Sequence, residues 1–199
     1  MQNSLKRETM PVISILRKAH IRTVMITGTS LLSLITNIDV NFILGDNIET
    51  AISVARDCGI VDISTKIISL KVDAVDDRHI FCDYIDDTSN VPFSKFEFEN
   101  EVRLLCKISG SVMQNNFFAQ QECNFALDGR TWSRLCELHP HLVSHVILRT
   151  TIFARFQPDQ KTEIIQCLQK LDYIACMVGD GANDCGVSVT YKKNCDTTV

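Results

Sequence analysis

Tyr173-Ile174-Ala175-Cys176-Met177-Val178-Gly179-Asp180-Gly181-Ala182-Asn183-Asp184-Cys185-Gly186 is the stretch that decides the fold class. Its first six residues read as an apolar strand, and the remainder is a glycine-rich turn that carries two carboxylates and an amide. Because open α/β sheets bind ligands beyond the carboxyl ends of their strands, we expect Asp180 just past a strand over 173–178. Such a turn suits Mg²⁺ and phosphate, since glycines let the backbone approach closely and Mg²⁺ prefers oxygen ligands.

The segments before this turn alternate between strand and helix patterns. Short β-branched runs predict strands at 22–28, 66–72, 79–85, 123–127 and 151–155, and the first and last of these are expected to be buried. Apolar residues at helical spacing predict helices from Thr9, from Asp46 or Asn47 to Gly59, from 128 to 138, and from Pro158 to 171. This alternation predicts an α/β domain with a Rossmann-like parallel sheet. The segment 86–121 has no clear periodicity, and its sequence fits either loops or a small insertion.

The composition is that of an ordinary soluble globular protein. The chain has 199 residues, of which 45% are hydrophobic and 22% charged, and its net charge is −4. A chain of this charge has no electrostatic footprint for nucleic acid, so no nucleic-acid partner is expected. The N-terminus lacks the apolar core of a signal peptide, and the longest apolar stretch, 31–44, is too interrupted to span a membrane. Nine cysteines without a Cys-x-x-Cys pair indicate reduced thiols.

Several polar residues fall at strand ends or on the adjoining helix. They are Thr27, Lys161, Asp180, Asn183 and Asp184. A hydroxyl can bond a phosphoryl oxygen, an ammonium can offset its charge, and carboxylates can hold a bridging Mg²⁺, so the set outlines a phosphate site. Taken singly, Lys161 would more often be a solvated helix residue and Thr27 a simple strand-end hydroxyl; only their joint placement favours the site.

The histidines near Pro140 are a second candidate cluster. His139, His141 and His145 could suggest a metal site, but no cysteine or carboxylate completes a ligand set in the sequence. A surface cluster is the favoured interpretation.

Four stretches resemble the haloacid-dehalogenase-like phosphorylation domain of P-type ATPases, and more narrowly the B branch of the fifth subfamily, which comprises polyamine or cation transporters. They are RTVMITG at 22–28, GDNIETAISVARDCG at 45–59, FARFQPDQK at 153–161 and GDGANDCG at 179–186. The resemblance implies that Asp180 and Asp184 belong to a Mg²⁺ site. It further implies that Lys161 contacts an aspartyl-phosphate.

The resemblance also implies a Thr-Gly-Asp motif, which here is interrupted. Thr27 and Gly28 are separated from Asp46 by residues 29–45, and deletion of these residues restores the motif. Gly28, Asp46 and Asn183 would then contribute to cofactor binding. After Gly186 the sequence departs from the family pattern. We expect a partial phosphorylation domain over 1–186 and a divergent tail over 187–199, and we interpret 29–45 and the tail as retained intron sequence.

The family uses ATP and Mg²⁺, forms an aspartyl-phosphate, and couples its hydrolysis to the transport of a cation or polyamine. For a complete protein, the resemblance implies an endomembrane such as the late endosome or lysosome, whereas the fragment itself is expected in the cytosol. The phosphorylated aspartate of the family lies in Asp-Lys-Thr-Gly-Thr, which these residues do not contain; Asp86-Asp87-Thr88-Ser89 reads as an acidic loop. Membrane helices and the nucleotide-binding and actuator domains are also absent from the sequence.

The chain is therefore expected to be inactive alone, with a weakened Mg²⁺ site. Two other interpretations stay open: a non-catalytic soluble module that binds a partner, and a truncated product without function. A stand-alone phosphatase of the same superfamily ranks last, because it would need a nucleophilic aspartate near the first strand.

Overall fold

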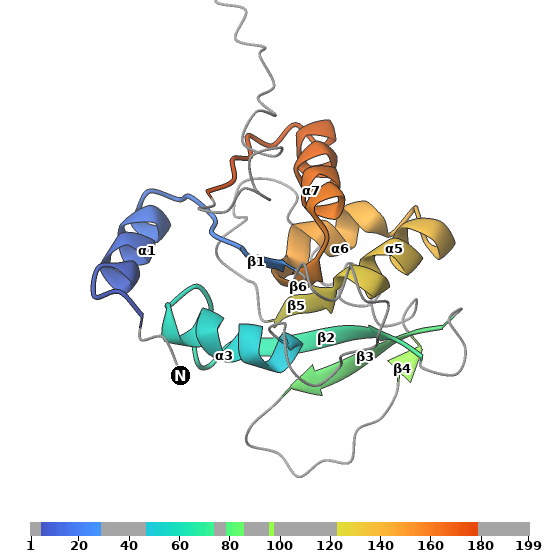
Figure 1. Cartoon of the computed structure of the whole chain (residues 1–199), viewed down its shortest axis with the longest axis horizontal. Coiled ribbons are helices and arrows are strands. Elements are labelled where there is room, and N and C mark those ends of the chain that lie inside the picture. The colour runs from blue at the N-terminus through green and yellow to red at the C-terminus, as the bar shows by residue number, and fades with distance from the viewer. Residues whose placement is uncertain (1–4, 29–46, 74–78, 86–95, 98–122, 179–199) are drawn as a thin grey trace, which may run out of the picture.

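The computed structural model describes residues 5–28, 47–73, 79–85, 96–97 and 123–178. In chain order the elements are α1 (Thr9–Lys18), β1 (Met25–Gly28), α3 (Ile48–Asp57), β2 (Lys66–Val72), β3 (Ile80–Ile85), β4 (Phe96–Glu97), β5 (Cys123–Asp128), α5 (Gly129–Leu138), α6 (Val143–Arg149), β6 (Thr150–Phe156) and α7 (Pro158–Lys170). The α/β class predicted from the sequence is confirmed (Figure 1).

The described strands form one sheet in the order β1-β6-β5-β2-β3-β4. β1, β6, β5 and β2 run parallel, whereas β3 and β4 are antiparallel at the far edge. The Rossmann-like parallel sheet is thus confirmed for its β1 to β2 half. β4 lies inside the segment 86–121, for which the sequence predicted no element.

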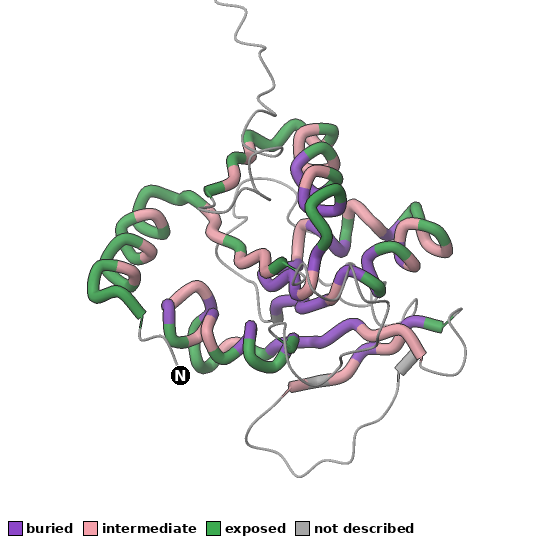
Figure 2. Tube along the Cα trace, viewed as in Figure 1, coloured by how far each residue is buried: buried purple, intermediate pink, exposed green. Residues whose placement is uncertain are grey.

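Helices cover both faces of the sheet (Figure 1). One face packs against α5, α6 and α7, and its core includes Trp132, Val146, Ile164, Phe125 and Phe153. The other face packs against α3, whose buried residues Ile48, Ala51, Ile52 and Ala55 meet Ile67, Ala126 and Ile152. The side chains of consecutive strand residues thus point to opposite faces of the sheet, as strand geometry requires. Figure 2 shows the buried residues gathered on the strands and on the inward sides of these helices.

Local signals explain several helix ends. The carboxylate of Asp128 accepts the N–H of Thr131 at 2.8 Å and caps α5. α3 ends at Asp57, and Gly59 has φ of 75°, a left-handed conformation that glycine adopts without steric penalty. The sequence analysis predicted both boundaries to within two residues, but it missed α6.

The strand predicted over 173–178 is wrong. These residues have no regular secondary structure, and the side chains of Ile174 and Val178 are fully exposed, at 104% and 95%. An apolar run becomes a strand only where a neighbouring strand accepts its backbone hydrogen bonds and its side chains find a surface to cover. Within the described residues, this segment pairs with no strand of the sheet.

β1 differs from expectation as well, because among the described strands it lies at the edge of the sheet rather than in its buried centre. Its residues are half-buried or exposed, and its described partner is β6. The approach to β1 is fixed by Arg22, whose guanidinium donates to the carbonyls of Leu148 at 2.7 Å and Thr150 at 2.6 Å. Burial lowers the pKa of Arg22 to about 10, with Tyr173 acting in the opposite direction.

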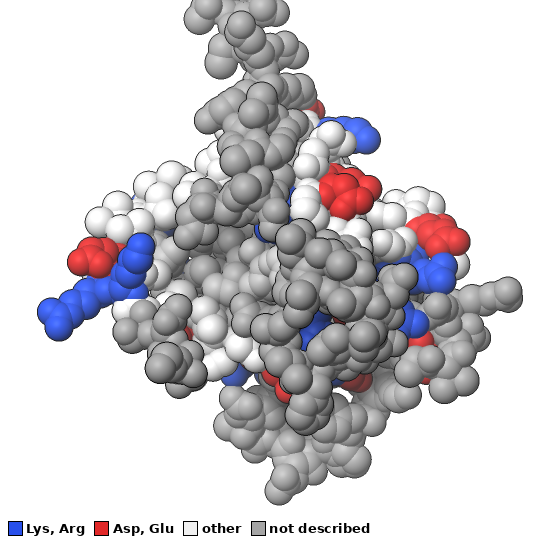
Figure 3. All heavy atoms as spheres, in the orientation of Figure 1, with Lys and Arg blue, Asp and Glu red and all other residues white. Residues whose placement is uncertain are grey.

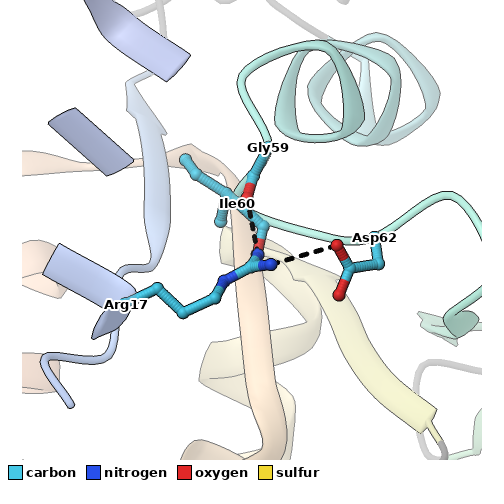
Figure 4. Close-up of polar contacts among 4 residues, drawn as sticks. All are labelled: Arg17, Gly59, Ile60 and Asp62. Carbon is cyan, nitrogen blue, oxygen red and sulfur yellow. Dashed lines mark hydrogen bonds and ion pairs between the residues drawn. The ribbon is translucent and has the colours of Figure 1, made fainter. Parts of the chain in front are cut away.

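α1 is a helix, as predicted, but none of its residues is buried. Its connection to the rest of the domain is polar: Arg17 donates to the carboxylate of Asp62 at 3.0 Å and to the carbonyls of Gly59 at 2.6 Å and Ile60 at 3.4 Å (Figure 4). Apolar side chains of α1, including Val12 and Ile15, remain exposed. The helical spacing of these residues therefore predicts the helix but not its packing.

Charged side chains of both signs are interspersed over the described surface in the view of Figure 3. No helix in the described part of the chain has the length and apolar character needed to cross a bilayer. The predicted interruption at 29–45 and the predicted tail at 187–199 lie outside the described residues.

Candidate phosphate-binding site

The carboxyl ends of β1 and β6 lie side by side and carry the described part of the predicted site. Ile26 is in register with Phe153, and Gly28 with Phe156, so β6 contains one extra residue between these two pairs. This is a β-bulge, which leaves one backbone amide outside the regular ladder and turns the strand end. Parallel strand ends of this kind are where α/β sheets place their ligands.

Thr27 accepts a hydrogen bond from the backbone amide that the bulge leaves outside the ladder. Its hydroxyl accepts the backbone N–H of Arg155 at 3.2 Å, and Arg155 has φ of 56°, which is uncommon for a residue with a side chain. A hydroxyl accepts and donates at the same time, so this bond leaves the proton of Thr27 for a second acceptor. The predicted phosphate contact and the observed structural bond are therefore compatible.

Lys161 reaches the same place from α7. The residue is 6% exposed, and its Nζ lies 3.5 Å from the position that a Cβ would occupy at Gly28. A side chain on residue 28 would thus stand against the ammonium group. A buried ammonium is costly unless polar or anionic groups surround it, so this position favours a negatively charged neighbour.

The start of α7 is tied to the start of α5 by Gln160. Its Nε2 donates to the carbonyl of Gly129 at 2.8 Å and to the hydroxyl of Ser133 at 2.9 Å, while its Oε1 accepts the N–H of Gln157 at 2.9 Å. Gln160 is 9% exposed and its bond to Gly129 is buried, whereas its bonds to Gln157 and Ser133 are part-buried. The sequence analysis missed this residue, although Gln157 followed by Gln160 at the start of a helix is a capping-box pattern.

The structure thus brings together Thr27, Gly28 and Lys161 of the seven predicted site residues. The remaining four, Asp46, Asp180, Asn183 and Asp184, lie outside the described residues. Because 173–178 is not a strand, the position that the sequence analysis gave to Asp180 at a strand end has no support from the residues before it.

No group of three or more His, Cys, Asp or Glu side chains in the described ranges is arranged to hold a metal ion. The ring centroids of His139 and His141 are 6.2 Å apart, and the rings meet edge to face.

The described part of the phosphate site offers a hydroxyl and an ammonium, which suit an anion.

No family model matches the chain. Among curated proteins, it is 35% identical over 192 residues to the polyamine-transporting ATPase 13A3 of Macaca fascicularis, a match that covers 94% of this chain and 14% of the relative. It is 34% identical over 187 residues to the polyamine-transporting ATPase 13A2 of Mus musculus, covering 94% of the chain and 13% of the relative. The probable cation-transporting ATPase 13A4 of Gallus gallus is 32% identical over 189 residues, with coverages of 94% and 14%.

The chain thus spans about one seventh of the length of these relatives, whereas each match takes in nearly all of the chain. The sequence similarity extends over the strands and helices described above and is not restricted to a single motif.

Proposed function

Because the chain is a relative of the 13A P-type ATPases over 94% of its length, we propose that it forms part of the phosphorylation domain of a polyamine- or cation-transporting ATPase with a haloacid-dehalogenase-like fold. In a complete protein, ATP hydrolysis through an aspartyl-phosphate would drive transport across an endomembrane such as that of the late endosome or lysosome. The observation that carries the proposal is the approach of the Lys161 ammonium to Gly28, beside Thr27.

Each described residue of the site has a distinct role in this proposal. Thr27 donates its free proton to a phosphoryl oxygen while it accepts the N–H of Arg155. Lys161 offsets the negative charge of the phosphoryl group in a poorly hydrated position, where such an interaction is stronger than in water. Gly28 brings the backbone close to the ammonium, since a Cβ on residue 28 would lie 3.5 Å from Nζ of Lys161.

The remaining roles rest on the resemblance of sequence motifs. Asp180 and Asp184 would hold Mg²⁺, which supplies charge neutralisation to the phosphoryl oxygens when bound. Asp46 and Asn183 would complete the binding of the nucleotide-derived phosphate.

We further propose that these 199 residues bind phosphate without turnover. Formation of an aspartyl-phosphate needs a carboxylate nucleophile, which the family supplies from Asp-Lys-Thr-Gly-Thr, and that motif is absent from the sequence. The site residues described here position and neutralise a phosphoryl group, but they include no nucleophile.

Phosphate binding by the 199-residue chain tests the proposal. Inorganic phosphate, added to tens of millimolar, is expected to shift the amide resonances of Thr27 and Gly28 in an isotope-labelled sample. Lys161→Gln should abolish these shifts, because the amide cannot offset the phosphate charge. Lys170→Gln is the matched control, since Lys170 is an exposed residue of the same helix. Absence of any shift in the wild type, or an unchanged response in Lys161→Gln, would contradict the proposal.

A further inference from the structure

The first turn of α7 contacts the chain at the ends of two strands, β1 and β5. α7 begins directly after β6, and β6 lies between β1 and β5 in the sheet. Consecutive residues of a helix point about 100° apart, so Gln160 and Lys161 leave the helix in different directions. Gln160 bonds to the β5–α5 junction, whereas Lys161 approaches Gly28 at the end of β1.

Gln160 is held at three points, which fixes both its amide plane and its rotamer. Both of its NH₂ hydrogens have acceptors, in the carbonyl of Gly129 and the hydroxyl of Ser133, and its oxygen accepts the N–H of Gln157. Ser133 in turn donates to the carbonyl of Gly129 at 3.2 Å. A buried amide with its donors and acceptor paired in this way is held firmly, because any rotation of the amide breaks several bonds at once.

Gly129 makes this close contact possible. A Cβ on residue 129 would lie 2.5 Å from Oε1 of Gln160 and 2.7 Å from the carbonyl oxygen of Arg155. The missing side chain therefore lets α7 and the end of β6 approach α5 more closely than another residue would allow. The approach fixes the rotation of α7 about its own axis.

We propose that Gln160 is a positioning residue that holds the Lys161 ammonium over Gly28. A rotation of α7 by about 20° would move a group about 6 Å from the helix axis by about 2 Å, enough to break an ammonium–phosphate contact. The two bonds that Gln160 donates to Gly129 and Ser133 oppose this rotation, because they join α7 to α5. The inference rests on the proposed function only in assigning a phosphate to Lys161; the geometric coupling of the two residues is independent of that assignment.

Residue-resolved acetylation of lysines in the folded 199-residue chain tests the coupling. Gln160→Glu keeps the length of the side chain but removes both donated bonds, and Gln160→Met removes all three. In both variants we expect Lys161 to be acetylated at least tenfold faster than in the wild type, since both lack the two bonds that Gln160 donates to α5. Gln166→Glu changes the same residue type at an exposed position of α7 and should leave the Lys161 rate unaltered.

Cys82 distinguishes local repositioning from a general loss of stability. It is fully buried on β3, at a distance from α7 in the sheet order, so its thiol reacts only when the domain opens. We expect its alkylation rate to rise by a clearly smaller factor than the Lys161 rate in both Gln160 variants, because a loss of global stability alone would raise both rates by the same factor. An unchanged Lys161 rate would overturn the proposal, and so would a parallel rise at Lys161 and Cys82.

If both Gln160 variants fail to fold, Ser133→Ala supplies the test, because it removes one acceptor and leaves Gln160 in place; a rise of about threefold at Lys161 is then expected. Addition of inorganic phosphate distinguishes the proposed phosphate site from the proposed positioning role of Gln160. Protection of Lys161 by phosphate in the wild type supports the proposed function. Loss of that protection, with the Gln160 effect intact, would overturn the phosphate site and leave the positioning role standing.

Discussion

The hydroxyl of Thr27 accepts the backbone N–H of Arg155 across 3.2 Å, at a point where Arg155 has φ of 56°. The bond joins the edge strand to the bulge of its neighbour and satisfies an amide that the ladder cannot use. The same threonine is thus a structural residue and a candidate phosphate donor, and substitutions separate these two roles.

Thr27→Val is expected to lower the free energy of unfolding by about 1–2 kcal/mol, because the isosteric side chain leaves the Arg155 amide without its acceptor. Thr27→Ser keeps the hydroxyl and should lie close to the wild type. Urea denaturation followed by the fluorescence of Trp132, the one tryptophan of the chain, measures both. Equal stability of the Val and Ser variants would show that the bond contributes little.

Gly129→Ala is expected to destabilise the domain by about 2 kcal/mol, since the new Cβ would overlap Gln160 and the carbonyl of Arg155. Gly59→Ala is the comparison variant: it has φ of 75° but open space around it, so strain of about 1 kcal/mol is expected from the backbone alone.

The double variant Gly129→Ala with Gln160→Ala tests the cause of that destabilisation. The double variant should lose less stability than the sum of the two single variants, because one of the two overlapping groups is then removed. A strictly additive double variant would contradict the contact as the origin of the effect.

Arg17→Gln is expected to increase hydrogen exchange in α1 about tenfold without a change in global stability, because the guanidinium attaches a helix that has no buried residue. Asp62→Asn should have a much smaller effect, since both side chains of this ion pair are about half exposed or more. Hydrogen exchange resolved by peptide measures both variants. Slower exchange or a large loss of global stability in Arg17→Gln would contradict the prediction.

Burial raises the pKa of the Cys136 thiol to about 11, with smaller contributions from Cys167 and Glu163. A raised pKa means that the folded state favours the neutral thiol. Its contribution to stability is therefore complete below pH 9 and is lost as the pH rises from 9 towards 11. We expect Cys136→Ala to reduce the loss of stability in this range. At pH 8, alkylation of Cys136 should be much slower than that of the exposed Cys176.

Equal alkylation rates for Cys136 and Cys176 would contradict the partial burial and the raised pKa of Cys136. Rapid alkylation of Cys176 also bears on the segment 173–178, because a buried strand there would protect this thiol. The experiment thus checks the corrected secondary structure as well.

Much of the fold was predictable because its signals are local. The β-branched run at 66–72 and the apolar spacing of Ile48, Ala51 and Ile52 each fixed an element almost to the residue. Pro158 marked the start of α7 in the same way. The approach of Lys161 to Gly28 was also expected, because ligand sites of α/β sheets form where parallel strands end at one edge of the sheet.

The misses share a physical cause, which is that pairing and packing depend on distant parts of the chain. The run 173–178 has the composition of a strand but finds no neighbour among the described residues. α1 has an amphipathic sequence, yet none of its residues is buried in the described structure. The left-handed backbone conformation of Arg155 has no sequence signature, because it arises from the register between β1 and β6.

By itself, the sequence determined the order and type of most elements and the parallel half of the sheet, since each follows from residue spacing and chain direction. Only the tertiary structure decided which strand is the edge, that Thr27 caps a bulge, and that Gln160 ties α7 to Gly129. These depend on contacts between segments far apart in the chain, for which burial and hydrogen-bond satisfaction outweigh local preference.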